Sequence, residues 1–315
     1  MLRYALNRLA LLIATVFVAS VAIFLVLEAL PGDAARTTLG ETATPEAVAA
    51  LTHRLGLDQP IALRYAHWIS GAAHGDLGQS TAYDSPIAPL LGQALAISLP
   101  LAVLATTIAV VVAFLAGAAA AQARGTRRDA LIVAATQLGL AAPSFWVSIL
   151  LVLVFAVRLH LAPAGGFPGW DHPLEALGAL VLPALALAAF QSAVLTRVIR
   201  SALIEAMGED FVRTARAKGL SRRAALWRHA LPNALTPVLT ILGLQFANLV
   251  AGAVVVENVF VLPGVGRLIL LAVANRDTLV VADAAMALAM LVICVSFIVD
   301  LACAAIDPRW RLASS

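Results

Sequence analysis

The sequence predicts an all-α integral membrane protein. Hydrophobic residues make up 62% of its 315 residues, charged residues make up only 12%, and the mean hydropathy is +0.94. A water-soluble core of this length needs much less apolar surface, so the composition excludes a soluble globular protein. In a bilayer, long apolar runs are tolerated when their backbone closes its own hydrogen bonds as helix.

Six stretches are long and apolar enough to cross the hydrocarbon core, which needs about 20 residues of helix. They lie at residues 9–30, within 85–123, and at 130–157, 176–196, 235–256 and 280–304. A cleaved signal peptide is the alternative for the first stretch, because Arg3 and Arg8 precede it. The stretch is longer than the usual signal core of about 7 to 15 residues, so we interpret it as the first transmembrane helix.

The distribution of Lys and Arg orients these six transmembrane helices, since positive residues that flank a span are retained in the cytoplasm. With the N-terminus inside, fifteen of the 21 basic residues lie in the cytoplasm. Eight of these fall between Arg197 and Arg228. The sequence therefore predicts that both termini are cytoplasmic.

The chain is expected to divide into two regions. Residues 1–93 hold the first transmembrane helix and a long extracytoplasmic loop. Residues 94–315 hold the other five transmembrane helices and a cytoplasmic loop at 210–232.

The long extracytoplasmic loop is expected to hold two short helices. Thr44 and Pro45 predict the start of the first, which ends at Gly56. The second, at residues 61–70, presents Tyr65, Trp68 and Ile69. Two interpretations stay open: a cap on the membrane surface with its tryptophan at headgroup level, or a gate or docking site for a partner.

The cytoplasmic loop carries the most specific pattern of the chain, DFVRTARAKGLSRRAALWRHALPNAL from Asp210. Asp210 is a good N-cap for one helix, and Gly219 suits the left-handed position that ends it. Ser221 can cap a second helix, which we expect to close at Leu231 and Pro232. The pattern predicts a helix, a glycine turn and another helix outside the bilayer.

Three functions fit such a basic helix pair. A helix-turn-helix could bind DNA, but this pair is tethered within a few residues of two membrane spans. The arginines could instead attract anionic lipid, at about 1 kcal/mol each. We favour a docking element for a cytoplasmic partner, because the loop has a defined pattern of two helices and a turn as well as positive charge.

The segment resembles the hallmark loop of a known family, the inner-membrane permease subunits of binding-protein-dependent ABC importers. That hallmark reads E-A-A, three residues, Gly, nine residues, then I-x-L-P. Its positions are occupied here by Arg213, Thr214, Ala215, Gly219, His229, Leu231 and Pro232. Arg213 replaces the glutamate and His229 the isoleucine. With Lys218, the run R-T-A-R-A-K-G-L resembles the branch that transports peptides and nickel, the dipeptide and oligopeptide permease B type.

Further matches follow in the family's order over nearly the whole chain. They are Gly56-Leu57-Asp58-Gln59-Pro60 and Gly75-Asp76-Leu77-Gly78 in the outer loop, an extracytoplasmic turn with Glu257, Pro263, Gly264 and Gly266, and the ending Asp307-Pro308-Arg309. The run Asn275-Arg276-Asp277-Thr278-Leu279 departs from relatives that carry an aromatic residue and a proline after the aspartate. That departure leaves the substrate class open.

The resemblance implies a type I importer permease in the bacterial inner membrane, with residues 210–232 as the coupling helix inserted into an ATPase subunit. It implies two ATPase subunits, a second homologous permease and an extracytoplasmic binding protein as partners. Dipeptides or oligopeptides are the expected substrates, and nickel or a metal chelate is the alternative. Selectivity in such systems lies largely with the binding protein.

The chain itself is not expected to be an enzyme or to hold a cofactor or metal. Lys218 is its only lysine, and it lies between Ala217 and Gly219, whereas a phosphate-binding P-loop ends in Gly-Lys-Ser/Thr. His229 is interpreted as a packing or hydrogen-bonding residue. ATP chemistry is therefore expected to come from another subunit.

An ion-coupled secondary transporter is the rival from another class. It would be expected to show internal repeats, broken helices or ionisable groups at mid-membrane. The polar candidates inside spans are Gln191, Gln245 and Asn248, which suit either interhelical hydrogen bonds or substrate contact. The small residues from Gly117 to Ala121 indicate close helix packing.

Overall fold

The computed structural model describes residues 2–29, 44–54 and 58–306. Within them the protein is helical apart from one two-stranded hairpin, which confirms the all-α class. The predicted matches at Gly56, Leu57 and Asp307-Pro308-Arg309 lie outside the described residues.

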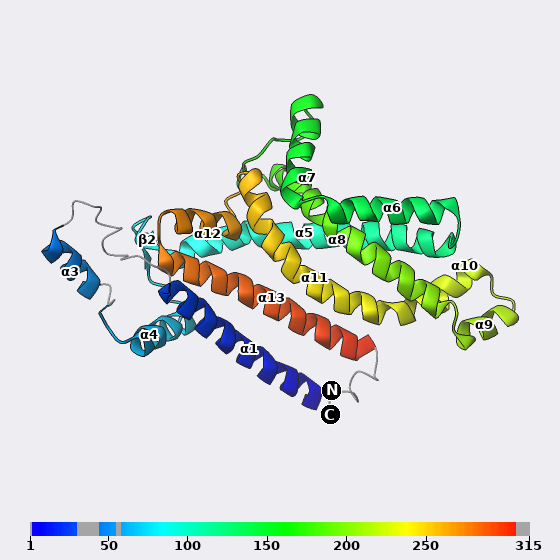
Figure 1. Cartoon of the computed structure of the whole chain (residues 1–315), viewed down its shortest axis with the longest axis horizontal. Coiled ribbons are helices and arrows are strands. Elements are labelled where there is room, and N and C mark those ends of the chain that lie inside the picture. The colour runs from blue at the N-terminus through cyan, green and yellow to red at the C-terminus, as the bar shows by residue number, and fades with distance from the viewer. Residues whose placement is uncertain (1, 30–43, 55–57, 307–315) are drawn as a thin grey trace. The chain divides into compact units, whose positions relative to one another are not determined.

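Figure 1 traces the elements in chain order. They are α1 (Leu2–Glu28), α3 (Pro45–Arg54), α4 (Ile61–Ala73), β1 (Gln79–Ser80), β2 (Ser85–Pro86), α5 (Ile87–Gln122), α6 (Arg127–Ala141), α7 (Ser144–Leu151), the π-helix η1 (Val152–Arg158), α8 (Pro173–Ala206), α9 (Asp210–Ala217), α10 (Arg222–Ala225), the π-helix η2 (Leu226–Ala230), α11 (Leu231–Val259), α12 (Val265–Ala274) and α13 (Thr278–Ile306).

The chain forms two compact units. Unit 1 comprises Met1–Leu9, Leu99–Leu262 and Cys294–Ser315, and unit 2 comprises Ala10–Ser98 and Pro263–Ile293. Helices α1, α5 and α13 each contribute to both units.

By length and composition, five helices of the described chain can cross a membrane. They are Tyr4–Glu28, Ile87–Gln122, Pro173–Ala206, Arg222–Val259 and Thr278–Ile306. The sixth predicted span, 130–157, is not one straight helix, because α6 and the α7–η1 helix meet at an angle of 101°. Pro143 explains the break, since Ala142 before it takes the extended backbone that a proline imposes on its predecessor. Six spans result when the bent pair counts as one.

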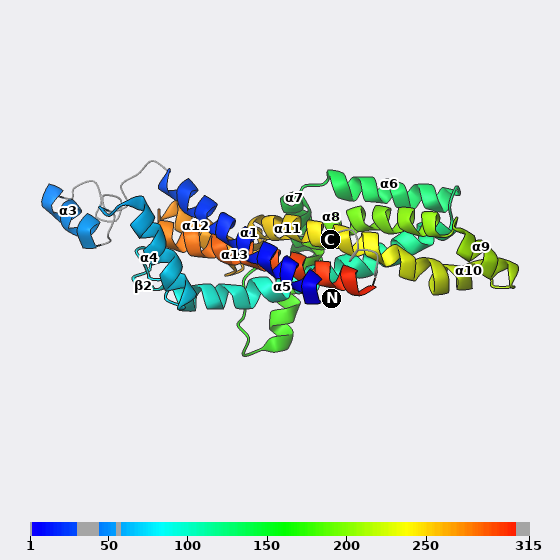
Figure 2. The ribbon, with the colours of Figure 1, turned by 90° about the horizontal axis from the view of Figure 1, so that it is seen from below.

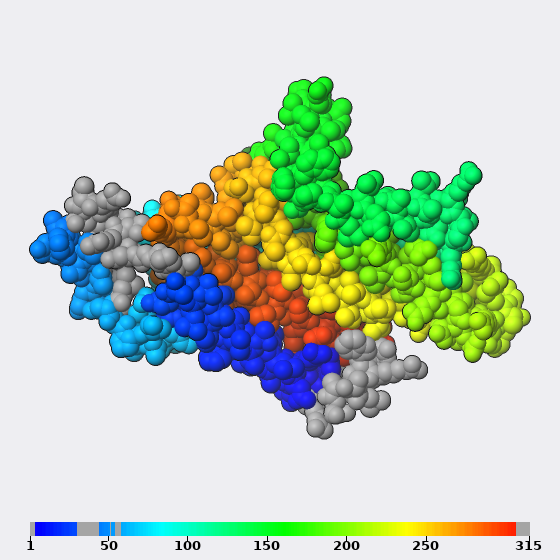
Figure 3. Space-filling view, viewed as in Figure 1, coloured from blue at the N-terminus to red at the C-terminus, as the bar shows by residue number. Residues whose placement is uncertain are grey.

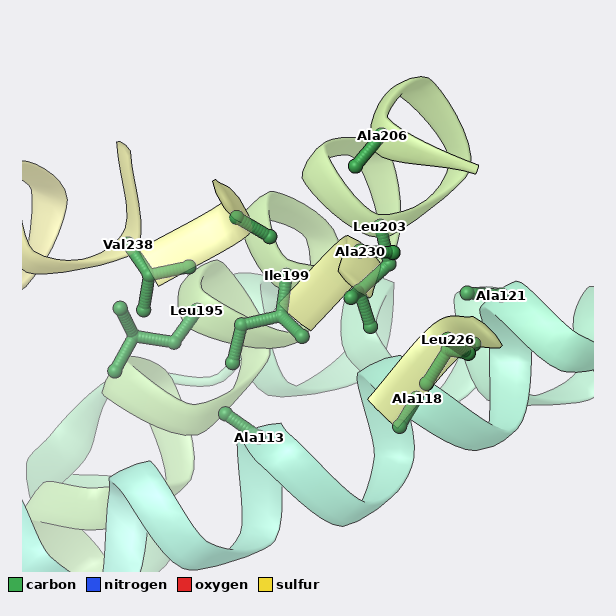
Figure 4. Packing of buried hydrophobic residues seen from close by; sticks show 11 residues of the cluster. Ala113, Ala118, Ala121, Leu195, Ile199, Leu203, Ala206, Leu226, Ala230 and Val238 are labelled. Atoms are coloured by element: carbon green, nitrogen blue, oxygen red, sulfur yellow. The ribbon is translucent and has the colours of Figure 1, made fainter. Parts of the chain in front are cut away.

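Small side chains join α5, α8, η2 and α11 in the core of unit 1 (Figure 4). The buried cluster contains Ala113, Ala118, Ala121, Leu195, Ile199, Leu203, Ala206, Leu226, Ala230, Ala234 and Val238. Gly117 shares this packing: a Cβ placed on it would lie 2.8 Å from Ile199 Cγ2 and 3.0 Å from the Thr196 carbonyl oxygen. The close helix packing predicted for residues 117–121 is confirmed.

An ion pair ties α6 to α8 within unit 1. Arg200 donates from Nε to Asp129 Oδ1 at 2.6 Å and from Nη2 to Oδ2 at 2.7 Å. The backbone N–H of Gly125 adds a bond of 3.1 Å to Asp129 Oδ2. This bidentate geometry is the strong form of an arginine–carboxylate pair, and it fixes the start of α6 on α8.

In unit 2, the two short helices predicted in the first loop are present as α3 and α4. Helix α4 continues to Ala73 instead of ending at residue 70, and Gly56, the predicted end of the first helix, lies outside the described residues. Thr44 Oγ1 accepts from the N–H of Ala47 at the start of α3. Helix α4 carries Tyr65, whose hydroxyl lies 2.8 Å from Ser20 Oγ of α1, and Arg64, which donates to Glu28 Oε1 at 2.7 Å.

Trp68 of α4 donates from Nε1 to Asp283 Oδ1 of α13 at 2.7 Å. It also stacks on Phe24 of α1 with the ring centroids 5.9 Å apart. Its polar atom is thus engaged by a helix of the same unit. Helix α4 is therefore fastened to both α1 and α13.

Helix α12 was not predicted from the sequence, which indicated only a turn before the last span. Its Val265, Leu268, Ile269 and Ala272 nevertheless follow helical spacing, and they pack in two small clusters with residues of α5 and α13. A helix of ten residues is too short to span a bilayer, so α12 is an accessory of unit 2.

Asp277 anchors the β1–β2 hairpin to the start of α13. Its side chain is buried and accepts from Ser80 Oγ at 2.6 Å, from the N–H of Ala82 at 3.1 Å and from the N–H of Val280 at 3.3 Å. Asp277 is the aspartate after which the sequence departs from the family's pattern, and it holds the hairpin against the start of α13.

Replacing Asp277 by alanine is expected to lower the thermal stability of the purified protein. The substitution removes three acceptor contacts at once, and each buried donor left without a partner costs about 1–3 kcal/mol. Differential scanning fluorimetry of the protein in detergent measures the shift. The control is Asp58→Ala, since Asp58 is an exposed aspartate that precedes α4. Equal melting temperatures for the two variants would contradict this role of Asp277.

Candidate functional site

The cytoplasmic segment forms the predicted helix, glycine turn and second helix. Helix α9 ends at Ala217, Lys218 follows as its C-cap, and Gly219 has φ +95°. This left-handed backbone is the conformation predicted for Gly219. Ser221 caps the next helix as predicted, because its Oγ accepts from the N–H of Ala224 at 3.2 Å.

Two local predictions were wrong. Glu209 occupies the N-cap position of α9, and Asp210 is instead the first helical residue, with its carboxylate 3.2 Å from Arg213 Nη1. The second helix does not close at Leu231 and Pro232 but continues into α11.

The π-helix η2 explains this continuity. Pro232 has no N–H to donate to the preceding turn, so it interrupts the hydrogen bonding of the helix at this point. The N–H of Leu231 bonds to the carbonyl of Leu226, one residue farther back than in an α-helix. The wider turn takes up the interruption, so one helix of 38 residues runs from Arg222 to Val259.

The predicted coupling residues lie on different faces of this segment. Arg213, Thr214, Lys218, Gly219 and Pro232 are exposed, His229 and Leu231 are half-buried, and Ala215 is buried. Val212, Leu226 and Ala230 are buried beside it, and Leu226 and Ala230 belong to the core cluster of unit 1 (Figure 4). The apolar side therefore fixes the segment on α5 and α8, and the polar side is free for a partner.

The exposed side of the segment combines positively charged side chains with two large aromatic side chains. The exposed cations are Arg213, Arg216, Lys218, Arg222, Arg223 and Arg228. Phe211 is 43% exposed, and Trp227 is 40% exposed although it packs on Phe114 with ring centroids 5.7 Å apart. Both ribbon views place α9 and α10 at the end of α8 (Figures 1 and 2). Such a mixture of arginine and aromatic side chains is typical of protein interfaces.

Of the predicted extracytoplasmic residues, Glu257 lies far from this segment along the same helix. Glu257 is buried near the end of α11, 26 residues beyond Leu231, which corresponds to roughly 39 Å of helix. Pro263 and Gly264 precede α12, and Gly266 is buried in its first turn. Glu257 and the cytoplasmic segment therefore lie toward opposite ends of α11.

Three hollows lie along α8 in unit 1, with volumes of about 340, 510 and 640 Å³. The first and second share Leu140, and the second and third share Ala202, Glu205 and Pro237. The three neighbouring hollows, together called the groove below, lie between the α6–α7 break and the start of α9. Beyond that break, α7 and η1 project away from α6 (Figure 3).

The first hollow brings together the three polar residues that the sequence singled out inside spans. Gln191 comes from α8, and Gln245 and Asn248 come from α11. Asn248 Nδ2 donates to Gln245 Oε1 at 2.8 Å. The sequence identified these residues one by one. The packing of α8 against α11 brings them together, and the bend at Pro143 adds the remaining wall of the hollow.

Comparison with known proteins decides the family. The sequence matches the family described as binding-protein-dependent transport system inner membrane component over residues 110–312, and its N-terminal counterpart over residues 1–112. The chain belongs to this family. It is therefore the multi-pass inner-membrane permease subunit of an ABC importer.

Relatives match over nearly their full length. The permease is 38% identical, over 97% of its chain and 98% of the relative, to a putative peptide transport system permease protein of Brucella abortus (strain 2308). It is 37% identical, over 99% of both chains, to the glutathione transport system permease protein GsiC of Escherichia coli (strain K12). A solved amino acid ABC transporter matches with a TM-score of 0.49 and 20% identity, over 68% of this chain and 92% of the other.

Proposed function

We propose that this permease imports peptides that an extracytoplasmic binding protein delivers. The observation that carries the proposal is the near full-length similarity to permeases named for peptide and glutathione transport. Glutathione is itself a small peptide, so these names favour peptides over the nickel alternative. The first hollow of the groove agrees with such a substrate, since its polar groups are neutral amides and a serine hydroxyl, which suit peptide groups.

We further propose that residues 210–232 form the coupling helix and that ATP is hydrolysed by partner subunits. The exposed face with Arg213, Thr214, Lys218 and Gly219 would enter a cleft on the ATPase, while buried Ala215 holds α9 in place. His229, Leu231 and Pro232 lie where the segment joins α11. The continuous helix from Arg222 to Val259 would carry a displacement of that face into the membrane.

The proposed assembly has two ATPase subunits, a second homologous permease and a binding protein. The second permease would close the open side of the groove along α8. On the outer side, Glu257, Pro263, Gly264 and Gly266 form the proposed extracytoplasmic turn. The division of the chain near residue 93 stays a prediction.

Uptake by the reconstituted complex tests the proposed function. Proteoliposomes that contain the permease and its partner subunits are supplied with the binding protein, with internal ATP and with labelled tripeptide, dipeptide or Ni²⁺. We expect ATP-dependent accumulation of a peptide, which stops when the phosphate-binding lysine of the ATPase is replaced. Accumulation of Ni²⁺ without any peptide would contradict the proposal.

A further inference from the structure

The hollow of about 340 Å³ at the α6–α7 break has the size of a small-ligand pocket. Its walls are Leu140, Ala141, Ala142, Pro143, Ser144, Leu187, Phe190, Gln191, Gln245, Asn248, Leu249 and Gly252. None of these wall residues is charged. Recognition in this hollow must therefore rely on amides, on apolar contact and on the ends of the broken helices.

Gln191 is the unusual member of the wall. Its side chain is only 2% exposed, and neither its Nε2 nor its Oε1 has a hydrogen-bond partner among the described residues. A buried amide without partners is rare, because desolvation of both polar atoms is not compensated. Its neighbours across the hollow, Gln245 and Asn248, are already bonded to each other. Gln191 is thus poised for a group that supplies both a donor and an acceptor.

The start of α7 provides a second polar feature. Pro143 caps this helix without a side-chain hydrogen bond, and the first backbone bond of the helix is from the N–H of Val147 to the Pro143 carbonyl. The N–H groups of the three residues between them therefore lack partners within the helix. The N-terminus of a helix carries partial positive charge, which favours an anion. Pro143 and Ser144 both line the hollow.

We propose that this hollow binds the C-terminal end of a peptide in transit. The peptide's carboxylate lies at the first turn of α7, and its last peptide group pairs with the amide of Gln191, one donor to one acceptor in each direction. Leu187 and Phe190 contact the last side chain of the peptide. This inference rests on the proposed peptide import. It further specifies that the membrane domain binds the C-terminal end of the peptide.

The test uses the complete reconstituted importer with two substitutions, Gln191→Leu and Gln191→Glu. The substrates are a labelled tripeptide with a free carboxylate and the same tripeptide with an amidated C-terminus. The binding protein is identical in all assays, so its own preference cancels when each variant is compared with the wild type. Gln137→Leu is the matched control, since Gln137 is exposed on α6 and does not line the hollow.

A site arranged to hydrogen-bond its substrate loses turnover strongly when one of its hydrogen-bonding groups is removed. We therefore expect Gln191→Leu to lower uptake of the free tripeptide roughly tenfold or more. Gln191→Glu keeps the side-chain shape but adds a negative charge. It should therefore reduce uptake of the free tripeptide more than uptake of the amidated one. Gln137→Leu should transport both peptides like the wild type.

Two results would overturn the inference and leave peptide import intact. One is wild-type uptake of both peptides by the Gln191 variants, and the other is an equal loss for both peptides in Gln191→Glu, which indicates a structural role. Failure of the wild type to take up any peptide would instead overturn the proposed function and the inference with it.

Discussion

Replacing Gly219 by valine is expected to lower ATP-driven uptake strongly while leaving the permease in the membrane. Gly219 has φ +95°, in the left-handed region where a residue with a side chain costs about 1–2 kcal/mol more than glycine. This corresponds to a factor of about 5 to 30 in the population of the intact turn. The turn joins α9 to the helix Arg222–Val259, which continues into the membrane. Loss of the turn would therefore uncouple the proposed docking face from that helix.

The expected result is measured as uptake in proteoliposomes and as copurification of the ATPase with the tagged permease. No heavy atom lies within 4 Å of a Cβ placed on Gly219, so the effect of valine arises from the backbone and not from a clash. Gly219→Asn should retain much of the uptake, because asparagine tolerates the left-handed region better than other residues with side chains.

Gly125→Val provides the matched control for Gly219→Val. Gly125 also has a positive φ, +79°, and open space around it, but it lies in the turn between α5 and α6. If both valine variants lose uptake equally, the effect reflects general strain. If Gly219→Val keeps normal uptake and normal copurification of the ATPase, the coupling assignment is wrong.

Hydropathy and turn residues were sufficient to predict most of the fold. A membrane span is encoded by a long local run of apolar residues, so the positions of α1, α5, α8, α11 and α13 followed from the sequence. The turn at Gly219 and the N-cap at Ser221 could also be predicted from the sequence, because a left-handed turn and an N-cap each depend on one residue type at one position.

What could not be predicted depends on geometry beyond single residues. An apolar run across Pro143 looks like a continuous span, and only the three-dimensional path reveals the bend of 101°. The same holds for η2, where the extra residue per turn lets the helix pass Pro232. In the candidate site, the proposed coupling residues came from the resemblance of residues 210–232 to the family's loop, whereas the hollow around Gln191 could not be predicted without the bend at Pro143.

Replacing Gly117 by alanine is expected to destabilise unit 1, although glycine to alanine usually stabilises a helix by about 0.5–1 kcal/mol. The added Cβ would lie 2.8 Å from Ile199 Cγ2 and 2.9 Å from Ile199 Cβ. Ile199 is itself only 1% exposed, so it has no free space in which to rotate away. Overpacking of this kind costs about 1–3 kcal/mol, which outweighs the gain in helix propensity.

Gly92→Ala should shift stability in the opposite direction. Gly92 lies on the same helix, α5, and a Cβ placed there meets no atom within 4 Å. Thermal unfolding in detergent can be followed with a thiol-reactive dye in a Cys294→Ser background, since Cys303 is buried whereas Cys294 is partly exposed. We expect the melting temperature to fall for Gly117→Ala and to stay or rise for Gly92→Ala.

Ile199→Ala in the Gly117→Ala background separates the clash from other causes. Removal of Cγ2 relieves the shortest contact, so part of the loss should be recovered relative to the sum of the two single substitutions. Strict additivity would mean that Gly117 acts elsewhere.

Because this cluster also holds Leu226 and Ala230 of η2, a recovery of stability should be accompanied by a recovery of ATPase copurification. The same packing that holds α5 against α8 would then hold the proposed coupling segment in its docking position.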